Sequence, residues 1–219
     1  MNWIKFVEYA QKHTDLLVKC LLEHIQLVGT ALFISLLIAI PVSLILLRLK
    51  KISQVVMALL GALYSIPSLA FFSLLLPFLG LGKKNAIFVL VVYSQFILVR
   101  NILAGFHQLD KNIIEAGIGM GMTKFTIFTG VQLPLVLPVL IGGIRIAAIV
   151  TIGSATIAQT VNAGGLGKVL FDGLSSMNYI KMIWGTVYTA GLALVVNWAL
   201  SRLEIYSLKR AEGRLGNAG

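Results

Sequence analysis

Residues 115–125 read EAGIGMGMTKF and separate two long, mostly apolar halves of the chain. Three of the first seven residues are glycine, and each glycine inside a helix costs about 1 kcal/mol relative to alanine. Glycine also removes the side chain wherever the backbone must turn or be approached closely. The stretch therefore predicts a connection between membrane spans rather than part of a span.

The composition is that of an integral membrane protein. Of the 219 residues, 58% are hydrophobic and only 12% are charged, and the mean hydropathy is +0.93. Soluble domains carry roughly 25% charged residues. The net charge of +10 does not indicate nucleic-acid binding, because the basic residues form short clusters between apolar runs and no continuous patch. The lone Cys20 excludes an intrachain disulfide and a CxxC metal site.

Five stretches are long enough to cross a bilayer, which takes about 20 mostly apolar residues. The loops between them are too short for a second domain, so we predict an all-α integral membrane fold. The predicted spans are about 25–48, 54–79, 85–107, 131–160 and 180–202. The predicted divisions are an N-terminal segment 1–22, a membrane domain 23–203 and a C-terminal cytoplasmic tail 204–219.

The N-terminal segment predicts an amphipathic helix in the membrane interface. Its charges recur at steps of three and four, which places them on one helical face, and apolar residues cover the opposite side. The charged residues are Lys5, Glu8, Lys12, Asp15 and Lys19. A helix packed on a partner subunit is the alternative.

The distribution of Lys and Arg predicts the orientation. Arg100 and Arg145 are left out, because the sequence does not give their depth. Nine of the other basic residues then lie on the side of the 108–130 loop, and seven lie on the opposite side. The chain is therefore expected to be a multi-pass protein of the cell membrane, with its N-terminus outside and both the loop and the C-terminus in the cytoplasm.

The predicted spans contain no acidic residue. Proton-coupled carriers commonly use intramembrane Asp or Glu, so this class is disfavoured, although sodium coupling through carbonyls and hydroxyls stays open. His13, His24 and His107 lie at span edges or outside the spans and show no metal-ligand spacing.

Residues 162–168, NAGGLGK, resemble a phosphate loop only superficially. Asn162 and Val169 stand where a Walker A motif needs Gly and Ser or Thr. The chain thus has no visible means of powering transport, and a partner must supply the energy.

The connection between the third and fourth spans predicts a cytoplasmic helix–turn–helix elbow. Asn112 and Glu115 have the spacing of a capping box, so a short helix is expected to begin there. Gly121 would turn the chain, and Thr123 would cap a second short helix.

Two prolines follow the elbow. Pro134 suits the first turn of the next helix, and Pro138 is expected to bend or loosen that helix one turn later.

The elbow resembles the EAA loop of the inner-membrane permeases of binding-protein-dependent ABC importers. The matching residues are EAG at 115–117, then Gly121, then the LP pair at 133–134. Two departures are the Gly in the third motif position, where the family has Ala, and the eleven residues before the LP pair, which slightly exceed the usual spacing. The resemblance covers roughly residues 23–203.

A narrower similarity is to the permeases of glycine betaine, carnitine and choline importers. It rests on SIPSLAFFSLLLPFLGLG, LVRNILAGF, EAGIGMGMTKF, QLPLVLPVLIGGIR and NAGGLGKVLFDGL. In that subfamily EAG is often ESG, and a Gly-Met-Thr follows, as it does at residues 121–123.

The resemblance implies a type I importer fold, a second permease subunit of the same or a similar chain and two cytoplasmic ATPases that bind ATP and Mg. It also implies an extracellular substrate-binding protein. The chain itself is then a non-catalytic subunit without cofactor or metal. In the family the elbow is called the coupling helix and docks into the ATPase, whereas an ordinary turn between helices is the alternative. The docking residues implied are Asn112, Glu115, Ala116, Gly117, Gly121, Met122 and Thr123.

Polar residues within the spans are candidates for the transport pathway or its gate. Each has a structural alternative, because hydroxyls often join helices, prolines serve packing, and a long cation can reach the interface. Tyr64 or Tyr93 could attract a quaternary ammonium by cation–π interaction. The candidates are Tyr64, Ser65, Pro67, Ser68, Tyr93, Arg145, Thr151 and Ser154.

The glycines of the 162–168 segment are expected outside the membrane. Gly164, Gly165 and Gly167 could form an outer gate or contact the binding protein.

Two classes of function follow. The first is the translocation subunit of an ATP-driven importer of quaternary ammonium osmolytes, alternating between outward and inward openings. An importer of another small solute, such as an amino acid, is a variant of it. The second class is a self-sufficient carrier or channel. The elbow favours the first class, and co-purification with an ATPase would distinguish the two.

Overall fold

The computed structural model describes residues 3–211 and 213. Within them every regular element is helical, which confirms the all-α prediction. Four long helices form the bundle: α2 (Thr14–Leu46), α6 (Lys83–His107), α9 (Leu133–Ile157) and α11 (Tyr179–Ala211). The shorter elements are α1 (Trp3–Lys12), α3 (Lys50–Tyr64), α4 (Ser68–Leu74), α5 (Leu76–Leu79), α7 (Lys111–Gly119), α8 (Lys124–Ile127), the π-helix η1 (Phe128–Gln132), the 3-10 helix η2 (Ala158–Val161) and α10 (Leu166–Ser175).

Long helices are the form that a lipid environment demands, because each backbone N–H and C=O must be satisfied within the chain. Four helical stretches of the described chain are long and apolar enough to span a membrane, and a bent helix pair raises the number to five. They are 14–46, 83–107, 124–161 and 179–211, with the bent pair at 50–74. The expected count of about five spans is confirmed.

The predicted span 54–79 is not one straight helix. The chain bends by 93° between α3 and α4, at a break over residues 65–67. Pro67 has no N–H and takes the extended angles φ −56° and ψ 131°, so the helix cannot continue through it. A proline also disfavours the helical conformation of the residue before it, which is Ile66.

The predicted N-terminal helix 1–22 is also divided. α1 ends at Lys12, and residues from Thr14 onward already belong to α2. α1 packs on α11 through Phe6, whose ring stacks on that of Trp184 at 4.4 Å. Burial raises the pKa of the Tyr9 phenol in α1, and the nearby Asp172 carboxylate of α10 raises it further.

Two further predicted boundaries are shifted outward. α2 begins eleven residues before the predicted span start at 25, and α11 continues through residues 204–211, which we had assigned to a tail. The rest of that tail, apart from Gly213, lies outside the described residues.

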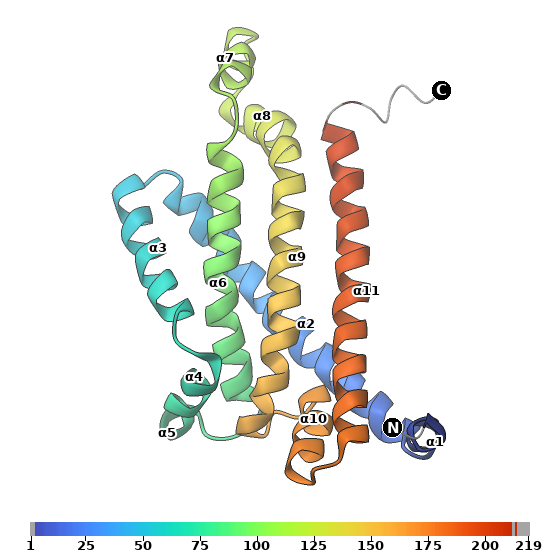
Figure 1. Cartoon of the computed structure of the whole chain (residues 1–219). Helices are drawn as coiled ribbons and strands as arrows, with labels where there is room; N and C mark the ends of the chain where they lie inside the picture. The colour runs from blue at the N-terminus through green and yellow to red at the C-terminus, as the bar shows by residue number, and fades with distance from the viewer. Residues whose placement is uncertain (1–2, 212, 214–219) are drawn as a thin grey trace, which may run out of the picture.

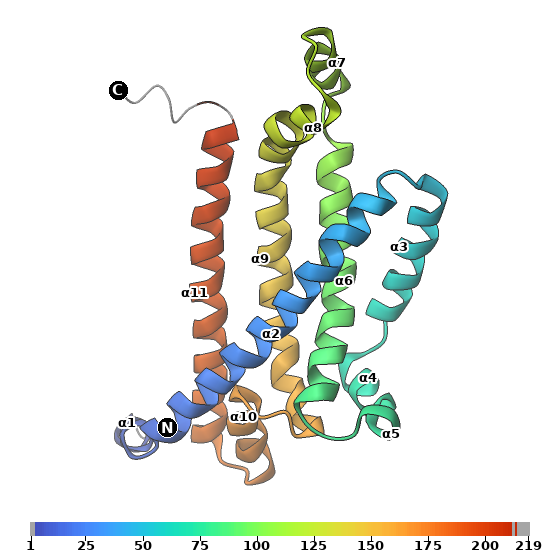
Figure 2. The ribbon, with the colours of Figure 1, turned by 180° about the vertical axis from the view of Figure 1, so that it is seen from behind.

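α6 is the centre of the bundle, since 61% of its most apolar 18-residue stretch is buried, more than in the other three long helices. It packs between α2 and α9, and in the view from behind α2 crosses both helices at a slant (Figure 2). The α7–α8 elbow lies at one end of the bundle, whereas α1 and α10 lie at the other (Figure 1). The two ends are therefore available for different partners.

Small residues set the distance between α6 and α9. A Cβ at Gly143 would lie 2.6 Å from the Cβ of Asn101, and a Cβ at Gly105 would lie 2.8 Å from Val136 Cγ1. Helices in lipid associate mainly through close van der Waals packing, which small residues permit.

We expect Gly143→Ala to lower the stability of the folded protein by about 1–3 kcal/mol, because the added methyl forces α6 and α9 apart. Gly153→Ala on the same helix is the matched control, since its Cβ would meet nothing within 4 Å. Thermal unfolding of both variants in detergent measures the difference. Equal unfolding temperatures would contradict the packing argument.

Candidate functional site

The elbow projects beyond the ends of α6 and α9 (Figure 1). It consists of α7, a turn and α8, as predicted. Gly121 has φ +78°, the left-handed conformation expected of a turning glycine. Its N–H donates to Ile118 O at 2.9 Å, and the Met122 N–H donates to Gly117 O at 3.1 Å.

The predicted capping box is wrong. Asp110, and not Asn112, is the N-cap of α7, and its carboxylate accepts a hydrogen bond from Asn112 N at 2.9 Å. Aspartate caps as well as asparagine does, and its negative charge also suits the positive end of the helix dipole. Asn112 therefore lies inside the first turn, where its backbone N–H is the group being capped.

The second cap is confirmed. The Thr123 hydroxyl accepts a hydrogen bond from Thr126 N at 3.2 Å and caps α8. Gly117 is buried between the two short helices, where its Cβ would lie 3.4 Å from Ile127 Cγ1 and 3.5 Å from Met122 Sδ. Gly117 thus faces the interior of the elbow, whereas Glu115 and Ala116 are exposed.

The elbow carries large apolar side chains that the described chain leaves uncovered. Exposed apolar side chains that cluster in this way mark an interaction surface. Their exposed fractions are 45% for Ile113, 61% for Ile118, 75% for Met120 and 76% for Phe125.

The elbow is continuous with a membrane helix. α8, η1, α9 and η2 follow one another without a break from Lys124 to Val161. Pro134 lies in the first turn of α9, as predicted, and Pro138 lies inside α9. The rings of Phe106 and Phe128 stack at 6.0 Å and join α6 to η1. The elbow is therefore connected directly to α9 and packed against α6.

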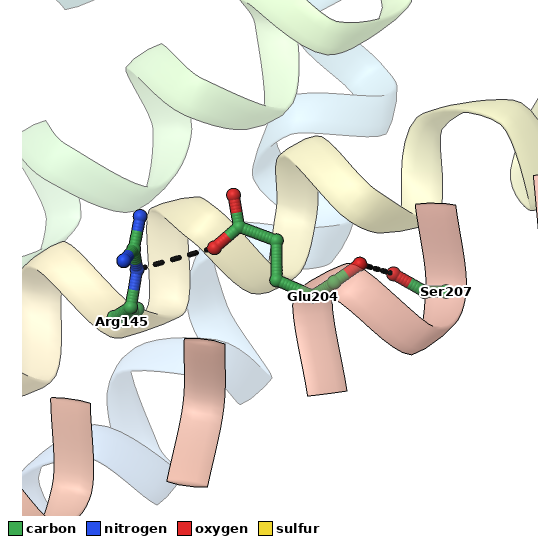
Figure 3. Close-up of polar contacts among 3 residues, drawn as sticks. All are labelled: Arg145, Glu204 and Ser207. Carbon is green, nitrogen blue, oxygen red and sulfur yellow. Dashed lines mark hydrogen bonds and ion pairs between the residues drawn. The ribbon is translucent and has the colours of Figure 1, made fainter. Parts of the chain in front are cut away.

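Arg145 of α9 forms an ion pair with Glu204 of α11 (Figure 3). Arg145 Nε and Glu204 Oε2 are 3.1 Å apart and shielded from solvent, without the alignment of a hydrogen bond. Gly142 makes room for the carboxylate, since its Cβ would lie 3.1 Å from Glu204 Oε1. Both side chains are 30% exposed. The ion pair joins α9 to α11, which supports the structural reading of Arg145.

Tyr64 and Tyr93 belong to an aromatic cluster at the broken span. Their ring centroids are 5.6 Å apart, and Tyr64 also stacks on Phe96 at 5.0 Å. The Tyr93 hydroxyl donates to the carbonyl of Ile66, directly before Pro67. Tyr93 therefore satisfies a carbonyl at the break, and neighbouring aromatic rings occupy part of the surface that a quaternary ammonium would need.

The serines beside this cluster have different environments. The Ser65 hydroxyl donates to Gly61 O at 2.9 Å, one turn earlier in α3. Ser68 is half-buried at the first residue of α4.

Thr151 joins helices, as the structural alternative predicted. Its hydroxyl lies 2.7 Å from Ala147 O and 3.0 Å from Ser94 Oγ of α6. Ser154, three residues later, is half-buried.

The glycines at the opposite end pack against other elements. A Cβ at Gly167 would lie 2.2 Å from Thr156 O, and a Cβ at Gly165 would lie 3.0 Å from His24 Nδ1. Gly164 and Gly165 have positive φ angles of 83° and 75°. Their segment is thus fixed by its own backbone shape and by close contacts.

The sequence interpretation missed Glu23 and His24, which hold this segment. Glu23 Oε2 accepts a hydrogen bond from Gly165 N at 3.2 Å, and His24 Nδ1 accepts one from Leu166 N at 3.3 Å. A buried role for His24 could be suspected only from its place directly before an apolar run.

Among the described residues, no group of three or more His, Cys, Asp or Glu is placed to hold a metal ion.

The profile of the family described as "Binding-protein-dependent transport system inner membrane component" matches residues 27–204. The chain is 36% identical to the carnitine transport permease protein OpuCB of Listeria monocytogenes over 83% of this chain and 84% of that protein. It is 35% identical to the choline transport system permease protein OpuBB of Bacillus subtilis (strain 168) over 90% of this chain and 91% of that protein.

The fold is similar to that of a solved transporter. A chain in the inward-facing MetNI methionine ABC transporter superposes with a TM-score of 0.80 at 24% identity, covering 90% of this chain and 98% of that one. This similarity confirms the predicted fold.

Two glycines of the elbow predict opposite effects. Gly117→Ala should stabilise α7 by up to about 1 kcal/mol, because the methyl fits beside Ile127 and the helix gains propensity. Gly121→Ala should destabilise the turn by about 1–2 kcal/mol, because its φ is +78°. Amide hydrogen exchange of residues 111–123 reports both changes. If both variants changed the exchange rates in the same direction, the described structure of the elbow would be contradicted.

Arg145→Gln and Glu204→Gln should each destabilise the protein by about 1–3 kcal/mol, because each leaves a half-buried charge without its partner. The double variant should lose less than the sum of the two. Arg202→Gln is the control, since this exposed arginine lies over the Trp198 ring at 5.6 Å. Thermal unfolding of the wild type, the two single variants and the double variant gives the cycle, and strict additivity would exclude an energetic coupling.

Proposed function

The chain belongs to the family of binding-protein-dependent transport system inner membrane components, and from that membership we propose that it is the translocation subunit of an ATP-driven importer of quaternary ammonium osmolytes. The family is the one that the EAG elbow resembles, so that prediction is confirmed. The chain is accordingly a multi-pass permease of the membrane.

The proposed substrates are glycine betaine, carnitine and choline. Two permeases that are 35–36% identical to this chain are named for carnitine and choline. The sequence similarity to permeases of glycine betaine importers adds the third. Because this chain provides only the membrane component, we assign the first recognition of the solute to an extracellular binding protein.

The exposed apolar side chains of the elbow are the observation that carries the proposal. Ile118, Met120 and Phe125 are each more than 60% exposed, and they belong to the elbow, which projects beyond the bundle. We assign this surface to a groove of a cytoplasmic ATPase, together with the exposed Glu115 and Ala116. Gly117, Gly121 and Thr123 then act indirectly, because they shape the elbow that docks.

The orientation and the assembly follow from this assignment. If the elbow docks on a cytoplasmic ATPase, α10 and α1 lie on the outer side, and the N-terminus is outside. Two ATPases bind ATP and Mg, and a second copy or a similar permease completes the pathway. No residue of this chain is assigned to ATP, Mg or catalysis.

The residues of this chain act by transmitting movement. Closure of the ATPases displaces the elbow, and α9 carries the displacement because it is continuous with α8. The Arg145–Glu204 ion pair passes the movement to α11. Such rigid-body shifts alternate the access of a pathway between its two ends. Tyr64, Ser68 and Ser154, all half-buried, are the described candidates for its lining.

The outer end is assigned to gating and to contact with the binding protein. Gly164, Gly165 and Gly167 shape the turn into α10 there. Their close packing supports a preformed surface rather than a loose loop.

The decisive experiment is purification of this chain with co-expressed ATPase and binding protein, in wild type, Glu115→Lys and Gly121→Trp. We expect each variant to reduce the retained ATPase or the ATP-driven betaine uptake into proteoliposomes at least about tenfold. A charge reversal and a bulky ring at a positive-φ glycine both alter the docking surface. Leu137→Ala, on the exposed side of α9, is the control and should behave as wild type.

Two results would overturn the proposal. The purified chain alone could move solute along an ion gradient without any ATPase, which would make it a self-sufficient carrier. Alternatively, the complex could drive uptake of amino acids but not of betaine, carnitine or choline, which would overturn the substrate class and keep the importer.

A further inference from the structure

His24 connects three helical elements from a fully buried position. The side chain has an exposed fraction of 0% and extends from α2. Nε2 lies 3.1 Å from Ile152 O of α9, and Nδ1 lies 3.3 Å from Leu166 N at the start of α10. Because a carbonyl only accepts and an N–H only donates, Nε2 carries the proton and Nδ1 offers its lone pair. This arrangement requires a neutral imidazole in one tautomer.

Glu23 strengthens the same connection. Its Oε2 accepts a hydrogen bond from Gly165 N at 3.2 Å, so two neighbouring residues of α2 satisfy two successive N–H groups at the start of α10. The N-cap residue Gly165 has no side chain that could do so. We call Glu23, His24, Gly165, Leu166 and Ile152 the outer clasp.

Close packing holds α10 at all of its joints, and at the joint with α2 a Cβ built on Gly165 would lie 3.2 Å from His24 Cα. Gly167 brings α10 against Thr156 O at the end of α9, with 2.2 Å to a Cβ built at the glycine. Gly185 brings α11 against the Leu170 backbone, where the built Cβ would lie 3.0 Å from Leu170 N. These contacts are close backbone packing and tie α10 to the adjoining ends of α9 and α11 as one unit.

What the clasp adds to the joint between α2 and that unit is hydrogen bonds from side chains of α2. Apolar contacts accompany them, since Leu17 and Cys20 of α2 pack with Leu166 and Val169. Hydrogen bonds can be exchanged for water at little net cost when the freed groups become hydrated. Glu23 also lines an open surface hollow of about 630 Å³ with Asp15, Val18, Lys19, Leu22 and Gln26, so the Glu23 end of the clasp is not enclosed by the described chain. A polar joint that is open at its Glu23 end is suited to repeated breaking and re-forming.

We propose that the outer clasp is a latch on the outer gate, closed in the state described here and released when the ATPases bind ATP. This inference rests on the proposed function, because the elbow must supply the movement. α9 carries the elbow at one end and provides Ile152 O at the other. Movement of α9 relative to α2 therefore stretches the clasp while the glycine contacts of α10 hold. Glu23 and His24 are positioning residues in this scheme.

A latch differs from a permanent cap in its dependence on the transport state. A cap protects the Gly165 and Leu166 amides equally in every state, whereas a latch protects them only while the outer gate is closed. Amide hydrogen exchange measures this difference directly, because these two N–H groups are the donors of the clasp.

The test uses the whole importer in lipid nanodiscs, with peptides that cover residues 162–170. Exchange is compared between the nucleotide-free complex and the complex trapped with ATP and vanadate. We expect the Gly165 and Leu166 amides to exchange at least about tenfold faster in the trapped state. His24→Ala should accelerate exchange in the nucleotide-free complex to a similar degree and remove the difference between the states.

Matched variants separate the latch from general loosening. His13→Ala changes the half-buried histidine at the start of α2, whose ring packs on Tyr9 at 4.4 Å, and should keep the wild-type pattern. Glu23→Gln keeps an oxygen that can accept from Gly165 N and should retain most of the protection, whereas Glu23→Ala should lose it. If His24→Ala fails to fold, the wild-type comparison and the Glu23 pair still decide the matter.

The possible failures are distinguishable. Equal exchange in both states, with vanadate-sensitive ATP hydrolysis intact, would overturn the latch and leave the importer. Failure of any ATPase to associate would overturn the proposed function, and the ATP-driven latch with it. Acceleration by His13→Ala equal to that by His24→Ala would also overturn the latch, because the effect would then be a general loosening of α2.

Discussion

An unsatisfied backbone group costs several kcal/mol in hydrocarbon, and this constraint governs where the chain can depart from a helix. The long helices satisfy their own N–H and C=O groups. Where a helix breaks or begins within the bundle, side chains from other helices take over. Tyr93 donates to the carbonyl of Ile66 at the break before Pro67, and Glu23 and His24 accept from the first amides of α10. The irregular segments are therefore held by particular residues.

The elbow obeys the same rule by local means. Because it projects beyond the bundle, Asp110 and Thr123 can cap its two helices with their own side chains. Because the caps are local, the outward face of the elbow is not needed to hold its helices in place, and that face is apolar and exposed. The contrast separates the two ends of the molecule. The elbow is capped by its own residues and available to a partner, whereas the first amides of α10 depend on side chains of α2.

The sequence predicted best what is encoded locally. The turn at Gly121, the cap at Thr123 and the approximate spans depend on residues a few positions apart, and the structure agrees with them. The sequence predicted Asn112 as the cap because Glu115, three residues later, completes the spacing of a capping box; the actual cap is Asp110. The 93° bend between α3 and α4 could not be predicted from the sequence, since a proline in an apolar run is compatible with a straight or a broken span. His24 was missed because its partner Leu166 is 142 residues away.

The ion pair of Arg145 lies on α9, the helix that connects the two ends of the bundle. Sequence placed its charge in α9 without a partner, because Glu204 lay beyond the predicted end of the last span; the extension of α11 brings the two together. From Lys124 to Val161 the continuous helical rod has 38 residues, or about 57 Å. Along it lie the elbow, the ion pair to α11 and the carbonyl that His24 binds. A rod of this length cannot shift at one end without loading the other two joints. The joint to α2 is made by hydrogen bonds that are buried at His24 and reach an open surface at Glu23, and it is the one that the proposed latch opens and closes.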